Sequence, residues 1–328
     1  MKLSRNSKIF INYFLGPLLF AWLSWSIYRQ IRQQPGLEQA WERIRSTFSG
    51  PLLINGVSVV LLMFVNWGIE AYKWQLSVKP VQLVSYPKAL MAVLSGVSFS
   101  VTTPNRMGEY LGRLLYMNEG NRLKTISITI VGSISQLIIT LLAGTLGLFF
   151  LKQDIVNRQL VSPMWLNMIQ YGVLAVLLVL ILFYFRLSWM IRWIDRLPGS
   201  KRFSYLVEAL EEFRSGLLLR LLLLSLLRFG VFLFQYFLLF ELFDVHLTVG
   251  QLCWTISVSF LVMAAVPTIA VAELAQRGAV VTAVVGLFSA NELGMTFATA
   301  GIWFINLIIP AITGSLLILR MRRIVKTD

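Results

Sequence analysis

Cysteine, histidine and aspartate are scarce in this sequence of 328 residues. It holds one cysteine, Cys253, and one histidine, His246. These numbers exclude an intramolecular disulfide framework and a metal site built from cysteines or clustered histidines. The sequence also has no Gly-x4-Gly-Lys-Ser/Thr segment that would cradle the phosphates of ATP. We therefore expect no metal and no cofactor.

Charged residues are also few. They make up 13% of the chain, against 57% hydrophobic residues and a mean hydropathy of +0.73, whereas soluble domains carry about 25% charged residues. We predict an all-α, polytopic membrane helical bundle: a single transmembrane domain over 1–328 with halves 1–160 and 161–328 and no soluble domain. The net charge is +14, and the basic residues lie beside apolar runs, where they set topology and meet anionic lipid headgroups rather than nucleic acid.

Long apolar runs fill most of the chain, and several reach the ~20 residues that cross a bilayer. We predict six full spans, the first of them uncleaved, and two shorter hairpins that are re-entrant or formed by broken helices, over 89–121 and 250–292. The six full spans are expected at 9–28, 51–72, 125–151, 164–185, 217–241 and 294–319.

The distribution of basic residues predicts the orientation. Both termini and the 186–215 loop are expected in the cytoplasm of a cell whose inner membrane holds the protein, and the 242–249 link is expected outside. Lys73, Lys79 and Lys88 count as further inside charges after the second span. The two hairpins then enter from opposite faces, which is typical of an inverted repeat. The basic 29–48 loop fits this topology badly, and we interpret it as an amphipathic interfacial helix.

Two charged motifs interrupt the apolar sequence in matching halves of the chain. In each, a proline is followed after four or five residues by a glutamate, and four positions later by an arginine. On a helix this spacing puts glutamate and arginine on one face in the favourable order. The motifs read Pro104-Asn-Arg106-Met-Gly108-Glu109-Tyr-Leu-Gly-Arg113 and Pro267-Thr-Ile-Ala-Val-Ala-Glu273-Leu-Ala-Gln-Arg277.

The prolines favour a break before a new half-helix, because proline disfavours helix in the residue before it. We predict helix breaks at Pro104, Gly108 and Pro267. Unpaired backbone amides at a half-helix start attract anions. We therefore predict a polar cavity in which five residues bind substrate: Arg106, Glu109, Arg113, Glu273 and Arg277. The simpler alternative is that each Glu–Arg pair neutralises itself and only holds the bundle together.

Other polar residues also lie within the apolar runs. Arg228 is the most costly of these to bury; we expect it to pair with Glu70 or Glu109 or to line the same cavity, with Glu70 as a second possible cavity residue. Asn66, Gln136, Gln235 and Asn306 more often join helices by hydrogen bonds. Tryptophans near span ends, Trp67, Trp74 and Trp165 among them, are interpreted as interfacial.

The first motif resembles the Pro-x-Arg-x-Gly-Glu signature of the lysylphosphatidylglycerol synthase transmembrane-region family, also called the flippase-like domain family. The resemblance implies a polytopic bacterial or archaeal membrane domain that, in fused members, moves aminoacylated phosphatidylglycerol between leaflets. Those members carry a soluble aminoacyltransferase domain after the membrane region, which we expect this chain to lack. The second motif departs from the family's Pro-Gly-Gly-type loop, because Pro267 is followed by Thr-Ile-Ala.

Three functions remain open from the sequence. The first is a flippase-like transporter for an anionic phospholipid or related amphiphile, whose partners are membrane lipids, a second copy of the chain or a separate lipid-modifying enzyme. The second is a non-transporting membrane partner of another protein. The third is an intramembrane lipid-modifying enzyme with Glu109 or Glu273 as general base, which the shortage of aspartate and histidine disfavours.

Overall fold

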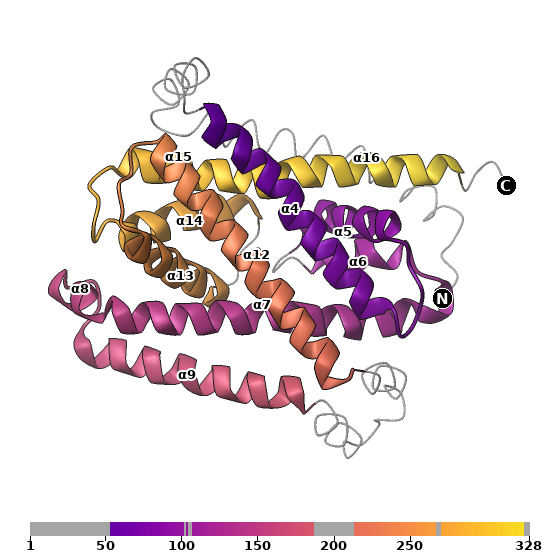
Figure 1. The fold of residues 1–328 in the computed structure, drawn as a ribbon, viewed down its shortest axis with the longest axis horizontal. Helices are drawn as coiled ribbons and strands as arrows, with labels where there is room; N and C mark the ends of the chain where they lie inside the picture. Colours follow the sequence, from indigo (N-terminus) through magenta and orange to yellow (C-terminus); the bar gives the residue numbers. More distant parts are fainter. Residues whose placement is uncertain (1–52, 102, 104–106, 187–212, 267–269, 325–328) are drawn as a thin grey trace.

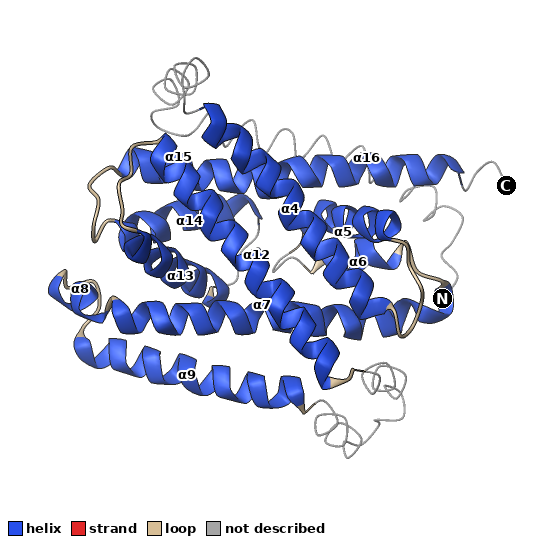
Figure 2. Ribbon diagram, viewed as in Figure 1, coloured by secondary structure: helices blue, strands red, loops and turns tan. Residues whose placement is uncertain are grey.

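The structure, a computed structural model, describes residues 53–101, 103, 107–186, 213–266 and 270–324. All the regular elements in these ranges are helices (Figure 2), which confirms the all-α prediction. The predicted first span at 9–28, the 29–48 loop and most of the 186–215 loop lie outside the described residues.

Five stretches of the described chain are long and apolar enough to cross a membrane. They follow the predicted runs closely, and the protein is a multi-pass membrane protein. The last stretch changes from α to π geometry and back without a break in the chain. The helices are α4 (Leu53–Val78), α7 (Arg122–Phe150), α9 (Pro163–Phe185), α12 (Ser215–Leu242), and the continuous series α15 (Glu292–Trp303), η5 (Phe304–Ile308) and α16 (Ile309–Ile324).

The two predicted hairpins are each a pair of short helices in mutual contact. None of the four reaches 18 residues, and at 1.5 Å per residue none is long enough for the ~30 Å hydrocarbon core. The first pair is α5 (Tyr86–Ser100) with α6 (Gly108–Leu114), and the second is α13 (Val249–Ala265) with α14 (Ala270–Val285). Helix α14 contains Glu273 and Arg277 of the second motif and also the apolar residues that follow them, so the motif and this run form one helix.

The hairpins lie on either side of α4 and α12, two long helices that pack side by side and run diagonally through the molecule (Figure 1). The connections into and out of the α5–α6 hairpin lie at the end of the molecule where α16 ends. Those of the α13–α14 hairpin lie at the opposite end. Helix α5 packs on α16, and α13 packs on α7. The two hairpins therefore point toward each other through the middle of the bundle.

Local sequence signals start several of these helices. Proline occupies the first turn of α5 and of α9, where its missing N–H costs no hydrogen bond. Thr248 and Gln251 form a capping box at the start of α13, and the Asn291 side chain accepts from Gly294 N at the start of α15. Two short helices, η3 (Glu119–Asn121) and α8 (Lys152–Asn157), complete the loops on either end of α7.

Glycine lets the two helices of the first hairpin touch backbone to backbone. A Cβ at Gly108 would overlap the carbonyl of Phe99, and one at Gly112 would overlap the backbone of Gly96. Gly108, predicted as a helix break, is the first residue of α6. Its absence of a side chain serves this close approach as well.

The interpretation of the tryptophans as interfacial is wrong for two of them. Trp67 and Trp74 are 5% and 1% exposed, within the main hydrophobic core, whereas Trp165 is 60% exposed. The reason is that α12, α5 and α7 pack against α4 and cover the side of the helix that carries both indoles.

Candidate functional site: a charged cavity between the hairpins

A cavity of about 710 Å³ opens where the two hairpins approach α4, α7 and α12. Residues from both charged motifs line it, together with residues of the long helices. Its remaining wall is largely aromatic and aliphatic. The charged lining residues are Glu70, Lys73, Glu109, Arg228, Glu273 and Arg277.

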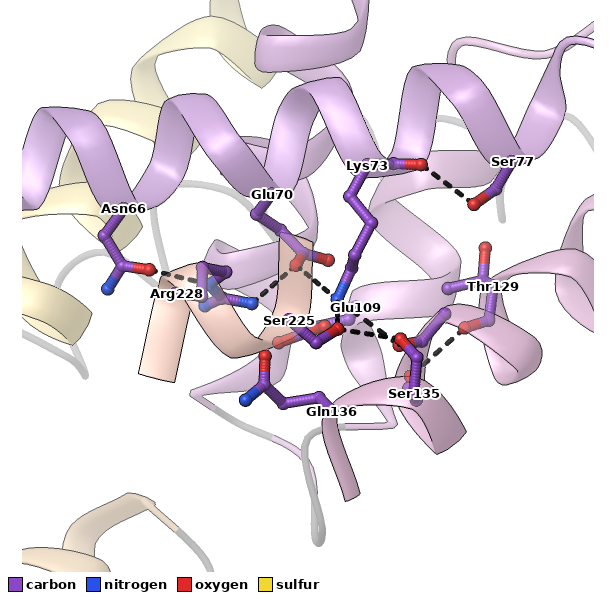
Figure 3. Close-up of polar contacts among 12 residues, drawn as sticks. Asn66, Glu70, Lys73, Ser77, Glu109, Thr129, Ser135, Gln136, Ser225 and Arg228 are labelled. Atoms are coloured by element: carbon purple, nitrogen blue, oxygen red, sulfur yellow. Dashed lines mark hydrogen bonds and ion pairs between the residues drawn. The ribbon is translucent and has the colours of Figure 1, made fainter. Parts of the chain in front are cut away.

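Glu70 of α4 is the centre of a buried ion-pair cluster (Figure 3). Its carboxylate lies 3.0 Å from Lys73 Nζ and 3.0 Å from Arg113 Nη2, and it also accepts from Arg228 Nη1. These three cations come from α4, α6 and α12. One carboxylate thus connects the first hairpin with α4 and α12. The expected pairing of Arg228 with Glu70 is present.

The first motif contributes its glutamate and arginine in different ways. Glu109 lines the cavity, and its Oε2 accepts from Arg113 Nη2 at 3.1 Å. The Arg113 side chain is only 4% exposed, and it bridges Glu109 to Glu70 beneath the cavity wall. Pro104 and Arg106 lie outside the described residues.

In the second motif, the arginine binds the glutamate through two hydrogen bonds. Arg277 donates to Glu273 Oε1 from both Nε, at 3.0 Å, and Nη2, at 2.6 Å. Both residues line the cavity from α14, which begins at Ala270, shortly after Pro267. Pro267 itself lies outside the described residues. The structure therefore brings Glu109, Glu273 and Arg277 to one cavity, with Arg113 behind its wall. The assignment of these four as substrate-binding residues stays a prediction.

Arg228 is held by polar and aromatic contacts on α4 and α12. Its Nε donates to Asn66 Oδ1 at 2.6 Å. Its guanidinium carbon lies 5.4 Å from the ring centre of Trp67 and 5.9 Å from that of Phe232, within the range of cation–π attraction.

A chain of hydrogen-bonded side-chain amides fixes Asn66, the partner of Arg228. Asn66 Nδ2 donates to Asn306 Oδ1 at 3.2 Å, Asn306 Nδ2 donates to Gln235 Oε1 at 3.0 Å, and Gln235 Nε2 donates to the Val59 carbonyl at 2.9 Å. Asn306 lies in the π-helical segment η5, a geometry often found at functional sites. Three of the four amides expected to join helices, all but Gln136, do so here.

Lys73 is the site residue that sequence reasoning missed, because it was counted with the basic residues that follow the second span. It is 2% exposed. Besides Glu70, its ammonium donates to the Gly132 carbonyl and to Ser225 Oγ, both at 3.3 Å, and Ser225 Oγ lies 2.8 Å from Ser135 Oγ. The spacing of Glu70 and Lys73, three residues apart on a helix, was the available signal.

The cluster around Glu70 carries a surplus of positive charge. Among the described residues, three cations, Lys73, Arg113 and Arg228, face two carboxylates, Glu70 and Glu109, so one positive charge remains, while the Glu273–Arg277 pair has no net charge. A buried surplus charge favours an anionic ligand. Within the described ranges, no group of three or more His, Cys, Asp or Glu side chains is placed to hold a metal ion.

A family model for the lysylphosphatidylglycerol synthase TM region matches residues 13–317. The chain belongs to this family. The match spans both hairpins, all five described long helices and every charged residue of the cavity. A comparison with curated proteins finds no match. For this member of the family, the cavity between the hairpins is thus the candidate functional site.

Proposed function

We propose that this lysylphosphatidylglycerol synthase TM region protein moves an amphiphile with an anionic headgroup between the leaflets of the cell membrane. The observation that carries the proposal is the cavity itself. It receives charged residues from both hairpins and from α4 and α12, and its ion-pair cluster has one positive charge in excess.

The arrangement of helices supports this proposal. Each half of the described chain has a long helix, a short-helix hairpin and another long helix, in the orders α4, α5–α6, α7 and α12, α13–α14, α15–α16. The hairpins come from opposite ends of the molecule (Figure 1). In our proposal, the two halves form an inverted repeat, in which a central site is reached alternately from the two faces. The N- and C-termini are then cytoplasmic.

The cavity wall also suits a headgroup whose acyl chains stay in the lipid. Phe229, Phe232 and Phe260 line it beside the charged residues. In our proposal, the headgroup enters the polar part of the cavity, and the glycerol and first methylenes contact the aromatic wall. The motif glutamates orient the arginines and keep the empty cavity nearly neutral.

Leaflet exchange of fluorescent phospholipids in liposomes tests this function. Purified protein would be compared with its Glu109→Gln and Glu273→Gln variants, using anionic and zwitterionic headgroups. Glu119→Gln is the matched control, because Glu119 lies in the exposed turn before α7 with a 92% exposed side chain. We expect exchange faster than in empty liposomes, lost in both cavity variants and retained in the control.

A non-transporting membrane partner is the second candidate function. It is favoured by the fact that Arg113 and Arg277 are each already paired with the glutamate of their own motif. Absence of exchange for every headgroup, together with cavity variants that lose thermal stability, would move the assignment to this alternative.

A further inference from the structure

One nitrogen of the Arg228 guanidinium makes no hydrogen bond to any described residue. Its Nε donates to Asn66, and its Nη1 donates to Glu70. Among the described residues, Nη2 has no partner, and the arginine lines the cavity. Arg228 belongs to neither charged motif.

The guanidinium is held in one orientation. Asn66 and Glu70 fix one edge of its plane, and the Trp67 ring lies 5.4 Å from its central carbon. Asn66 is itself fixed by Asn306 at 3.2 Å. The free Nη2 is therefore pre-organised, which reduces the entropic cost of binding a ligand there.

Gln136 of α7 presents a second unused polar group to the same cavity. Its side-chain oxygen is buried without a hydrogen-bond partner among the described residues, and the residue lines the cavity, to which its amide N–H group is the donor that it can offer. The residue before it, Ser135, contacts Ser225 at 2.8 Å, and Ser225 lies one helical turn before Arg228 on α12. Gln136 and Arg228 both line the cavity, and Figure 3 draws both side chains beside Ser225 and Ser135.

We infer that Arg228 and Gln136 form a subsite for the phosphate group of the ligand, and that the motif residue Arg113 is a positioning residue. The inference rests on the proposed function and names the chemistry of the group that is bound. A guanidinium edge and an amide N–H together match the two non-bridging oxygens of a phosphodiester. A phosphodiester carries one negative charge, which balances the single surplus positive charge of the cluster. Arg113 is already engaged by Glu70 and Glu109 and is nearly inaccessible.

The test is calorimetric titration of the purified full chain in detergent with a short-chain lipid, dihexanoylphosphatidylmethanol, which is a monoanionic phosphodiester. Uncharged dihexanoylglycerol is the control for the acyl chains. Dimethyl phosphate, a phosphodiester without acyl chains, distinguishes a lipid headgroup from a free phosphate ester. Binding that needs the chains indicates a lipid headgroup, whereas equal binding of dimethyl phosphate indicates a free phosphate ester.

The variants are Arg228→Gln, Gln136→Glu and Gln136→Leu, with Arg220→Gln as the matched control on the exposed side of α12. We expect Arg228→Gln and Gln136→Glu each to weaken binding by about 10- to 100-fold, as loss of a hydrogen bond to a charged group does. Gln136→Leu should weaken binding less than Gln136→Glu, because it adds no repelling charge. The control should bind as the unchanged protein does.

The subsite can still be tested if one of the variants fails to fold. Arg228→Gln leaves Glu70 with two cations, Lys73 and Arg113. If that variant nevertheless fails to fold, Gln136→Glu tests the subsite alone, since the new carboxylate would add a negative charge to the cavity wall. Folded variants at both positions that bind the lipid like the unchanged protein would overturn the subsite.

Leaflet exchange on the same variants separates this inference from the proposed function. Phosphodiester binding that depends on Arg228 and Gln136, in a protein that exchanges no lipid, would support the subsite and overturn the transport. Normal exchange in variants that retain full affinity would overturn the subsite and leave the transport in place.

Discussion

At the scale of single residues, Glu70 matters more to the structure than either motif glutamate. It contacts three cations from three helices, whereas Glu109 contacts Arg113 alone among the described residues. Burying several charges is tolerable only while each retains a partner. Removal of the Glu70 charge would leave Lys73 without a counter-ion and Arg113 dependent on Glu109.

We therefore predict that Glu70→Gln lowers the free energy of unfolding by about 3–5 kcal/mol, the usual cost of breaking a buried ion pair. Glu109→Gln should cost less, because Arg113 keeps its contact with Glu70. Thermal unfolding in detergent, followed by near-ultraviolet circular dichroism, measures both. Glu119→Gln, on the exposed turn, should leave the transition unchanged. A larger loss for Glu109→Gln than for Glu70→Gln would contradict the central role of Glu70.

A second residue-scale prediction concerns the amide chain behind Arg228. Asn306→Leu should destabilise the protein by about 1–3 kcal/mol, because it leaves the buried Gln235 and Asn66 amides each short of a partner. Asn118→Leu, at an exposed position, is the control. The same thermal measurement applies. Equal transitions for the two variants would show that the amide chain adds nothing to stability.

At the scale of elements, the two hairpins pack differently despite their similar charges. The α5–α6 hairpin joins through glycine backbone contacts at Gly96 and Gly112. In the α13–α14 hairpin, Gly278 has open space around the position of a Cβ.

We predict opposite effects of the same substitution in the two hairpins. Gly112→Ala should destabilise the protein by about 1–3 kcal/mol through overpacking against Gly96. Gly278→Ala should stabilise it by up to about 1 kcal/mol, because alanine is the better helix former and meets no neighbour. Comparison of the two unfolding temperatures is the measurement. Equal destabilisation would mean that the helices of the first hairpin separate without cost.

The sequence predicted these elements well, because their signals are local. Hydropathy placed the five described spans, and the residue spacing placed each Glu–Arg pair on one helical face. The burial of Lys73 and Trp74 was not predictable in the same way. It depends on α7 and α12 covering that face of α4, and those helices are distant in the sequence. The same holds for the cluster around Glu70, whose three cationic partners lie on three helices.

At the scale of the whole molecule, both hairpins reach one cavity from opposite ends (Figure 1). In a membrane, this requires that the loops flanking the two hairpins lie on opposite sides. The loop before α7 belongs to the end of the first hairpin, and the loop after α12 belongs to the end of the second. The basic residues of the 186–215 loop and of the C-terminus predict that the first of these ends faces the cytoplasm.

Accessibility of introduced cysteines tests this arrangement in cells. In a Cys253→Ser background, which removes the only cysteine, we would place single cysteines at the exposed positions Asn118 and His246. A membrane-impermeant maleimide should label the cysteine at 246 in intact spheroplasts. It should label the cysteine at 118 only after permeabilisation, because the predicted topology puts that loop in the cytoplasm. Labelling of both positions from the same side would place the hairpins on one face and would rule out an inverted repeat around the cavity.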